Sequence, residues 1–221
     1  MIRLVIFDLD GTLLDTVGDL AGACDELLAA RGYPGHSTEE YRRFVGNGIN
    51  KLIERALPAA AASPEAAAEL RPEFVRIYRS RITRSTRPYE GVAELLESLR
   101  GMGLKLAVAS NKFHGGTRQL VEHFFPGVEF CAVLGQREGV PMKPDPAVVR
   151  EIMDVAGVGC DEVLYVGDSG VDMQTARNAG VLAAGVTWGF RPRGELEACG
   201  ADYVVESAGA VALLAASLNG V

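Results

Sequence analysis

The chain has 221 residues, with 29 Asp and Glu against 22 Lys and Arg and a formal net charge of −7 at pH 7. Nucleic acids and anionic membrane surfaces are bound by clustered positive charge, so this excess of acid argues against both kinds of partner. Hydrophobic residues make up 48% of the chain and charged residues 23%, which is typical of a folded globular protein and excludes wholesale disorder. The length suits one large domain, or one domain that carries an insertion.

Cysteine usage and the N-terminal sequence bear on the cellular compartment. Cys24, Cys131, Cys160 and Cys199 form no Cys-x-x-Cys pair, so we expect reduced, mostly buried thiols in a cytoplasmic protein. No clean run of about 20 apolar residues is present, which argues against a membrane span. The apolar run at residues 4–7 is followed at once by two aspartates, which argues against a signal peptide.

Short apolar runs rich in β-branched residues alternate with segments of helical periodicity over most of the chain. Near-continuous apolar strands of this kind are typical of a parallel sheet that is buried on both faces. The expected strands are residues 2–7, 104–109, 129–133, 163–166, 181–186 and 203–205. The expected helices between them are residues 92–100, 116–124, 146–156 and 171–179. This alternation predicts an α/β fold with a doubly wound, Rossmann-like parallel sheet.

One long stretch interrupts the alternation. Between residues 17 and 87 no strand pattern appears, and helical patterns cover residues 17–31, 38–45, 48–57 and 64–84. About 70 residues of helix is far more than a crossover between two parallel strands requires. We therefore expect an inserted all-helical cap domain at residues 16–87 and an α/β catalytic core formed by residues 1–15 and 88–221.

The first expected strand ends in two carboxylates, Asp8 and Asp10, followed by Gly11 and Thr12. Ligands of open α/β sheets bind beyond the carboxyl ends of the strands, and residues two apart on an extended chain point the same way. Two carboxylates held close together repel each other unless a cation or a proton lies between them. Mg²⁺ suits an all-oxygen site, so the pair is a candidate magnesium site. Taken alone, Asp-x-Asp-Gly is equally compatible with an acidic turn.

The longer run that begins at Asp8, Asp-x-Asp-Gly-Thr-Leu-x-Asp, resembles the first motif of the phosphatase branch of the haloacid dehalogenase superfamily. The other motifs of that superfamily occur once each and in the same order. They are Ser110-Asn111-Lys112, Lys143 in a Lys-Pro-x-Pro segment, and Gly167-Asp168-Ser169-Gly170-Val171-Asp172. The resemblance covers the whole chain, the inserted helices included.

The resemblance implies a role for each matched residue. Asp8 would be the nucleophile that forms an aspartyl phosphate, and Asp10 would be the general acid and base. Lys143 would pair with the nucleophile and with the transferred phosphoryl group. Ser110 and Asn111 would contribute to substrate binding.

The resemblance also implies a Mg²⁺ cofactor. The ion would be held by Asp8, by the main-chain carbonyl of Asp10 and by Asp168, with Thr12 and Asp172 in supporting positions. The second aspartate, Asp10, separates branches of the superfamily, because dehalogenases lack it. Phosphoryl transfer is therefore favoured over dehalogenation.

Within the expected cap, residues 44–57 resemble the cap motif of phosphoglycolate phosphatases. Gly46, Asn47 and Gly48 come just before an expected helix, where exposed main-chain amides could bind a small carboxylate. An ordinary loop between two helices would have the same composition.

Two positions depart from the pattern of phosphoglycolate phosphatases. Phe113 follows Ser-Asn-Lys where that group often has Pro, and Asp145 follows Lys-Pro where it often has His. Neither residue alters the expected chemistry. Both leave room for another small phosphomonoester or for pyrophosphate.

The sequence therefore predicts a Mg²⁺-dependent phosphatase, monomeric or homodimeric, that acts on a small phosphorylated metabolite such as phosphoglycolate. A pyrophosphatase and a sugar-phosphate mutase of the same superfamily remain alternatives. A phosphorylatable receiver-like signalling protein is an alternative from a different class. Receivers share the strand-end acids and the lysine, but they lack the Asp-x-Asp-Gly-Thr spacing and a cap of about 70 residues.

Overall fold

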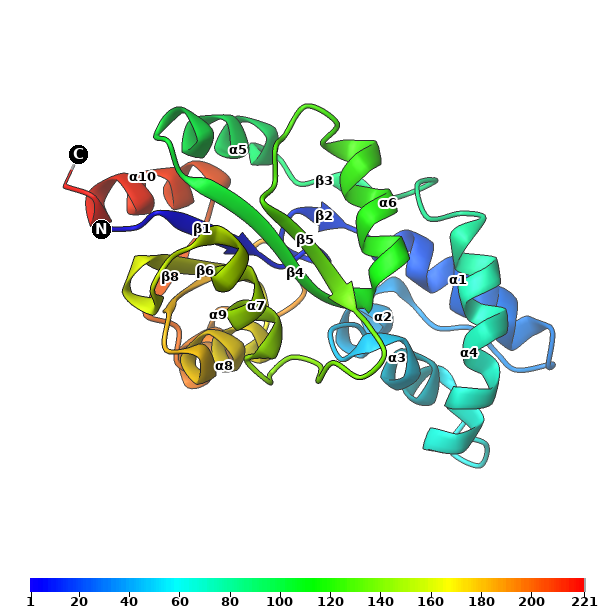
Figure 1. The fold of residues 1–221 in the computed structure, drawn as a ribbon. Coiled ribbons are helices and arrows are strands. Elements are labelled where there is room, and N and C mark those ends of the chain that lie inside the picture. The colour runs from blue at the N-terminus through cyan, green and yellow to red at the C-terminus, as the bar shows by residue number, and fades with distance from the viewer. Residues whose placement is uncertain (221) are drawn as a thin grey trace.

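The fold is built on a six-stranded sheet, described here from a computed structural model of residues 1–220 (Figure 1). The strands are β1 (Leu4–Phe7), β4 (Lys105–Phe113), β5 (Ala132–Gln136), β6 (Val163–Gly167), β7 (Leu182–Val186) and β8 (Tyr203–Val205). Their order is β5-β4-β1-β6-β7-β8, and every neighbouring pair is parallel. The predicted doubly wound α/β fold is thus confirmed. Val221, the last residue of the expected core, lies outside the described residues.

Helices cover both faces of the sheet. Side chains of a strand alternate between the faces, so Val5 and Phe7 of β1 join one buried cluster while Leu4 and Ile6 join the other. The first cluster includes side chains of α5 (Val92–Gly101), α6 (His114–Phe124) and α10 (Ala208–Leu218). The second includes side chains of α7 (Ala147–Ala156), α8 (Gly170–Ala179) and α9 (Arg193–Ala198). Burial on both faces explains why the central strands are continuous apolar runs.

Four further helices lie between two short antiparallel strands, β2 (Leu14–Asp15) and β3 (Arg87–Pro88), in chain order. They are α1 (Val17–Ala29), α2 (Thr38–Phe44), α3 (Gly48–Ala56) and α4 (Pro64–Arg79). The four helices pack against one another, and Figure 1 shows them at the end of the sheet toward which β4 and β5 run. They therefore lie where the strands present their carboxyl ends.

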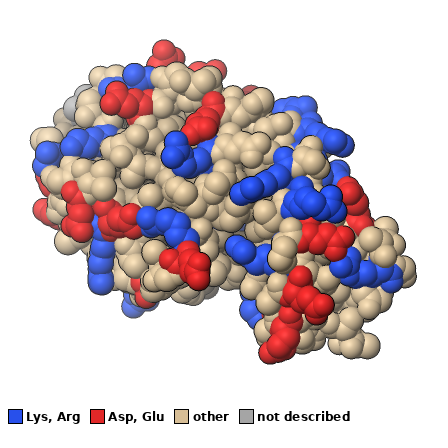
Figure 2. Space-filling view, turned by 45° about the vertical axis from the view of Figure 1, so that its right-hand side comes forward, with Lys and Arg blue, Asp and Glu red and all other residues tan. Residues whose placement is uncertain are grey.

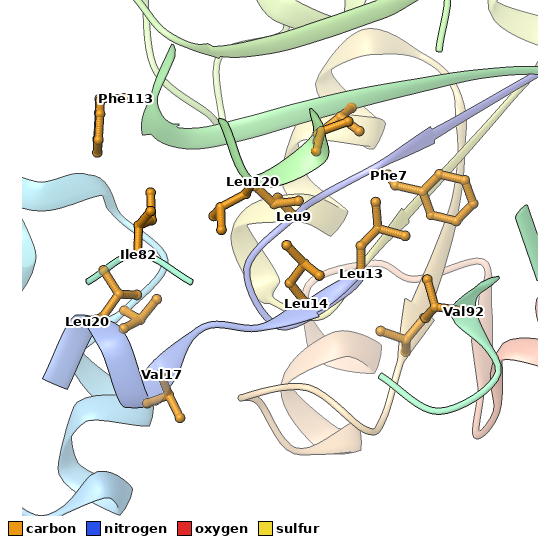
Figure 3. Close-up of a cluster of buried hydrophobic side chains, with 14 of the residues drawn as sticks. Phe7, Leu9, Leu13, Leu14, Val17, Leu20, Ile82, Val92, Phe113 and Leu120 are labelled. Atoms are coloured by element: carbon orange, nitrogen blue, oxygen red, sulfur yellow. The ribbon is translucent and has the colours of Figure 1, made fainter. Parts of the chain in front are cut away.

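A continuous set of apolar side chains joins the sheet to these helices (Figure 3). Leu9, Leu13 and Leu14 are buried between Phe7 on β1 and Leu20 on α1. The apolar residues interleaved with the Asp-x-Asp-Gly-Thr segment thus anchor that segment on both sides.

Strands β4 and β5 differ from the sequence-based expectation. β4 continues to Phe113 instead of ending at residue 109, and β5 begins at Ala132 instead of 129. The register shifts between Ala109 and Phe113, after which Phe113 pairs with Gln136, so the ladder continues past an irregularity. The Ser-Asn-Lys segment is therefore part of the strand. Its polar sequence hides this, although all three residues are buried.

Other differences are smaller. The periodicity of the sequence does not predict β2, β3, α9 or α10. Helix α10 is missed because its Ala- and Leu-rich sequence has no polar face that would show a helical repeat. Helix α4 ends at Arg79, and the expected extension to residue 84 is a series of turns. Ser80 donates its hydroxyl to the carbonyl of Ile77, a local bond that competes with continuation of the helix.

All four cysteines are free. Cys24 is buried, Cys131 and Cys199 are partly buried, and Cys160 is exposed. The expectation of mostly buried thiols is thus wrong, because Cys24 alone of the four is buried and Cys160 lies in a short 3₁₀ turn before β6. Across residues 1–220, none of the helices has the length and apolar character needed to cross a membrane.

Asp19 fixes the point at which the chain returns from α4 to the sheet. Its carboxylate is fully buried in the first turn of α1 and accepts hydrogen bonds from the main-chain amides of Ser85 (3.0 Å) and Thr86 (2.9 Å). The hydroxyl of Thr86 donates to the same carboxylate at 2.8 Å. A single side chain thus satisfies three donors from a turn that is remote in sequence.

We predict that Asp19→Ala lowers the free energy of unfolding by about 3 kcal/mol, because it leaves buried donors without an acceptor. Urea unfolding followed by circular dichroism measures the change. Asp154→Ala, at an exposed position of α7, is the control and should change the free energy by less than about 0.5 kcal/mol. Equal effects of the two substitutions would contradict the prediction.

Candidate active site

The residues singled out by sequence gather at the carboxyl edge of three neighbouring strands, β4, β1 and β6. Asp8 directly follows β1, Ser110 lies in the last part of β4, and Asp168 directly follows β6. Asp172 lies in the first turn of α8, and Lys143 lies in the loop before α7. The central position of β1 in the sheet order brings these five residues to one place.

Lys143 is the centre of the hydrogen bonding in this site. Its Nζ lies 3.0 Å from Oδ1 of Asp8 and 2.7 Å from Oδ1 of Asp172. The same ammonium donates to the carbonyl of Ala109 and to the hydroxyl of Tyr165, each at 3.0 Å. Burial alone would lower the pKa of Lys143, but Asp172 and Asp8 raise it well above its ordinary value. The ammonium is therefore charged and fixed in position.

Three carboxylates crowd around this lysine. Asp8, Asp168 and Asp172 are all buried, and each offers an oxygen within 4.8 Å of the other two. Burial, followed by repulsion from Asp172, raises the pKa of Asp8 to about 7 in spite of Lys143. Burial and the two neighbouring carboxylates raise the pKa of Asp168 well above its ordinary value. One ammonium does not balance three carboxylates, so this all-oxygen site fits a divalent cation such as Mg²⁺.

Asp172 is already occupied by protein donors. Its Oδ1 accepts from Lys143, and its Oδ2 accepts from the amide of Ser169 at 3.1 Å and from the hydroxyl of Ser169 at 2.6 Å. These bonds fit the supporting position expected for Asp172. They leave Asp8 and Asp168 as the two carboxylates for a cation.

The position of Asp168 depends on close backbone approach. The amide of Phe190 donates to its Oδ2 at 2.7 Å, and the hydroxyl of Thr12 lies 3.5 Å from its Oδ1. A Cβ atom at Gly11 or at Gly189 would collide with Asp168. Gly11 also has a φ of +89°, a conformation that side chains disfavour. The Gly of Asp-x-Asp-Gly-Thr is thus required by a carboxylate that lies more than 150 residues later in the chain.

The carboxylate of Asp10 does not join this cluster. Its two oxygens both accept from Nζ of Lys112, each at 2.9 Å. An extended chain would align Asp8 with Asp10, but the chain turns after β1, where the amides of Leu13 and Leu14 both bond to the carbonyl of Leu9. The side chains of Asp8 and Asp10 therefore have different partners, and the carbonyl of Asp10, which the resemblance implies as a ligand of Mg²⁺, stays a prediction.

Lys112 is a site residue that the sequence reasoning misses. It is treated there only as the last residue of the Ser-Asn-Lys match, although it is two positions from Ser110. If residues 110–112 are read as a strand, the side-chain period of two places Ser110 and Lys112 on one face, and this spacing could have identified Lys112 as a site residue. The structure buries both residues, and Ser110 Oγ accepts from the amide of Lys112 at 3.3 Å.

Asn111 connects three parts of the site. Its Nδ2 donates to the carbonyl of Gly46, between α2 and α3, at 3.2 Å and to the carbonyl of Lys143 at 3.1 Å. Its Oδ1 accepts from the amide of Lys143 at 2.9 Å. The side-chain amide thus holds β4, the Lys143 loop and the loop before α3 in one arrangement.

A small cavity lies between the sheet edge and the helices α1–α4. Its volume is about 30 Å³, which is room for about two water molecules. Asp8, Asp10 and Ser110 line it from the sheet, and Gly46 and Gly48 line it from the loop before α3. These residues are therefore brought together around one small space.

Asn47, the middle residue of the Gly-Asn-Gly loop, lies outside this cavity. Its Oδ1 accepts from Arg55 at 2.9 Å, and the residue lines an outer cleft of about 510 Å³ that also includes Arg71 and Arg137. The outer cleft shares Gly48 and Asn111 with the cavity, so the two are adjacent.

Arg191 is a second residue that the sequence reasoning misses. It follows β7 in the chain and donates to three main-chain carbonyls at the end of α2, those of Arg42 (2.5 Å), Arg43 (3.2 Å) and Val45 (2.6 Å). Main-chain acceptors leave no signal in the sequence. The preceding residue, Phe190, donates to Asp168, so one short segment contacts both the carboxylate cluster and the helices above it.

Surface charge of both signs surrounds the site. Figure 2 shows basic and acidic side chains interspersed over the face in view. Ion pairs at the protein surface include Arg118–Glu122 and Arg193–Glu206. The fixed positive charge at the site itself comes from buried Lys143 and Lys112.

These motifs and their geometry agree with a comparison against known protein families. A family model described as "Haloacid dehalogenase-like hydrolase" matches residues 5–186. The chain belongs to this family. The hydrolase is 36% identical over 211 residues to a phosphoglycolate phosphatase of Vibrio parahaemolyticus, a match that covers 93% of this chain and 92% of the relative.

Two further comparisons extend this finding. A phosphoglycolate phosphatase of Pseudomonas putida is 35% identical over 207 residues, covering 92% of the hydrolase and 76% of the relative. A crystal structure of a Lactobacillus delbrueckii subsp. bulgaricus protein superposes with a TM-score of 0.89 at 31% identity, covering 96% and 98% of the two chains. The predicted superfamily and the phosphatase class of the enzyme are confirmed.

We predict that Mg²⁺ raises the melting temperature of the hydrolase, and does so more near pH 8 than near pH 5, because protons compete with the ion for Asp8 and Asp168. Without metal, the raised pKa of Asp8 makes the protein less stable at higher pH. The folded state keeps a proton that the unfolded state loses between about pH 4 and pH 7, so stability falls as pH rises through that range.

Differential scanning fluorimetry with Mg²⁺ or with a chelator at the two pH values measures both effects. Asp168→Asn should abolish most of the Mg²⁺ effect, whereas Asp154→Asn should leave it intact. A Mg²⁺ effect that is larger at the lower pH would contradict the assignment of the ion to these carboxylates.

Proposed function

We propose that this hydrolase cleaves a small phosphomonoester that carries a carboxylate, with 2-phosphoglycolate as the substrate. The observation that carries the proposal is the buried Asp8 carboxylate, held 3.0 Å from Lys143 and open to a cavity with a volume of about 30 Å³. The names of the relatives from Vibrio and Pseudomonas support the same substrate.

In the proposed reaction, Asp8 is the nucleophile. One of its oxygens forms a bond to phosphorus while the bond between phosphorus and the ester oxygen breaks, which leaves an aspartyl phosphate and an alkoxide. Lys143 holds the attacking carboxylate in one orientation and stabilises negative charge on the transferred group. Ser110, at the cavity wall, is placed to donate to a phosphoryl oxygen.

Asp10 is the proposed proton carrier. It gives a proton to the departing alkoxide and later takes one from the water that attacks phosphorus, so the aspartyl phosphate is hydrolysed and Asp8 is regenerated. Its carboxylate lines the same cavity as Asp8, which supports this assignment. The products are inorganic phosphate and glycolate.

The carboxylates of Asp8 and Asp168 and the carbonyl of Asp10 are the proposed ligands of Mg²⁺. When bound, the ion supplies positive charge that offsets the carboxylates and polarises the phosphoryl oxygens. The three crowded carboxylates with their raised pKa values support this assignment.

The proposal includes a cap domain at residues 16–87 over a core formed by residues 1–15 and 88–221. The pairing of Asp15 with Arg87 at the boundary and the contacts of Arg191 with the end of α2 support this division. Such a cap would exclude bulk water from the aspartyl phosphate. The four free cysteines of the chain are in keeping with a cytoplasmic enzyme.

We predict that the enzyme releases phosphate from 2-phosphoglycolate with a kcat/KM at least about tenfold above that for hexose phosphates, nucleotides or pyrophosphate, because the narrow and mainly apolar cavity offers little space to a bulky leaving group. A phosphate-release assay over this panel, with Mg²⁺ and with a chelator, measures the preference. Release should continue without added bisphosphate, which distinguishes the enzyme from a mutase.

Asp8→Asn tests the nucleophile in the same assay. It should reduce turnover to less than about a thousandth while the fold, followed by circular dichroism, survives. Asp154→Asn is the matched control and should keep full activity. If Asp8→Asn retained more than a few per cent of activity, Asp8 would not be the nucleophile.

A further inference from the structure

Lys112 is a second buried ammonium in the site, and the proposed chemistry gives it no task. Its side chain is 3% exposed, and Asp10 is its ion-pair partner. Burial alone would lower the pKa of Lys112, but Asp10 raises it above its ordinary value, so the group stays charged. An ammonium has three donor protons, and the two oxygens of Asp10 account for two of them. One donor is left over.

Tyr78, from α4, lies beside this ammonium. Nζ of Lys112 is 4.8 Å from the centre of the Tyr78 ring, close enough for a cation–π contact. Tyr78 is 0% exposed, and its hydroxyl proton has no acceptor within residues 1–220, because the polar group beside it is the ammonium of Lys112, which is itself a donor. Burial raises the pKa of Tyr78 above its ordinary value, so the hydroxyl keeps its proton and can donate it. A buried donor without an acceptor indicates that an acceptor is missing.

Both groups line the cavity that contains Asp8 and Asp10. The remaining cavity wall on the side of α1–α4 is mainly apolar, formed by residues such as Leu20, Val45 and Leu52. Among the described residues that line this cavity, Lys112 is the one cation. A negatively charged substituent on the substrate would therefore find, among the described residues of the cavity wall, one positively charged partner, Lys112.

We propose that Lys112 and Tyr78 form the subsite for the carboxylate of the substrate, the group that does not react. Nζ of Lys112 shares its protons between Asp10 and that carboxylate, and the hydroxyl of Tyr78 donates to the same carboxylate. This inference rests on the proposed function and deepens it. The substrate class becomes short phosphate esters of hydroxy acids, and the specificity is determined jointly by the end of β4 and by α4.

The test compares two substrates of similar size that differ in the distal group. 2-Phosphoglycolate carries a carboxylate, and 2-hydroxyethyl phosphate carries a neutral hydroxymethyl group in its place. We expect the wild-type enzyme to prefer 2-phosphoglycolate by a large ratio of kcat/KM. Lys112→Met should reduce that ratio at least about tenfold, because it removes a charge-assisted hydrogen bond from one substrate alone. Loss of the Asp10 contact would reduce both rates, which the ratio cancels.

Tyr78→Phe removes one oxygen atom and keeps the ring. It should reduce the ratio about three- to tenfold, mainly through KM for 2-phosphoglycolate, because the lost bond acts on substrate binding. Lys51→Met is the matched control, since Lys51 is an exposed lysine of α3 that pairs with Glu54. It removes the same charge and should leave the ratio unchanged.

An equal loss on both substrates in Lys112→Met, with an unchanged ratio in Tyr78→Phe, would overturn the subsite and leave Lys112 as a positioning residue for Asp10. If Lys112→Met fails to fold, the ratio for Tyr78→Phe decides. Failure of the proposed function gives a different result. The wild-type enzyme would then hydrolyse other phosphomonoesters in preference to 2-phosphoglycolate, before any variant is made.

Discussion

The site is governed by an imbalance of buried charge. Asp8, Asp168 and Asp172 come within 4.8 Å of one another, and Lys143 is the one ammonium that contacts this cluster among the described residues. Carboxylates in such a place are costly unless positive charge is held close to them. The loop that carries Lys143, the serine that bonds Asp172 and the amide that bonds Asp168 all serve to reduce that cost. The remaining imbalance is what makes the site suited to a divalent ion and to chemistry on a phosphoryl group.

The two ends of the cavity differ in charge and in hydrogen bonding. At one end, carboxylates require a cation, and this is where the phosphoryl group is proposed to react. At the other end, the ammonium of Lys112 and the hydroxyl of Tyr78 are hydrogen-bond donors, and this is where the distal carboxylate is proposed to bind. Both ends line the same cavity of about 30 Å³, so the positions proposed for the phosphoryl group and for the carboxylate are close together.

Much of the fold can be predicted from the sequence because the central strands are buried on both faces and therefore form continuous apolar runs. The catalytic aspartates proposed for the site could be predicted because strand ends converge on one edge of a parallel sheet. The end of β4 could not be predicted, because the polar residues Ser110, Asn111 and Lys112 resemble a turn when it is not known that they are buried. The ion pair between Lys112 and Asp10 and the contacts of Arg191 depend on tertiary geometry, which periodicity does not encode. Helix α10 shows a different failure, in which an apolar surface on all sides removes the repeat that would identify a helix.

The contact between Arg191 and α2 has a consequence for how this enzyme can change. Arg191 binds main-chain carbonyls, which every amino acid provides, so the attachment is indifferent to which side chains α2 carries. Side-chain replacements in α2 can therefore leave these three hydrogen bonds in place, whereas replacement of Arg42 would remove its ion pair with Asp15 and its contact with the Phe190 ring. Because the neighbouring residue Phe190 bonds Asp168, variation in the exposed side chains of α2 need not disturb the carboxylate cluster.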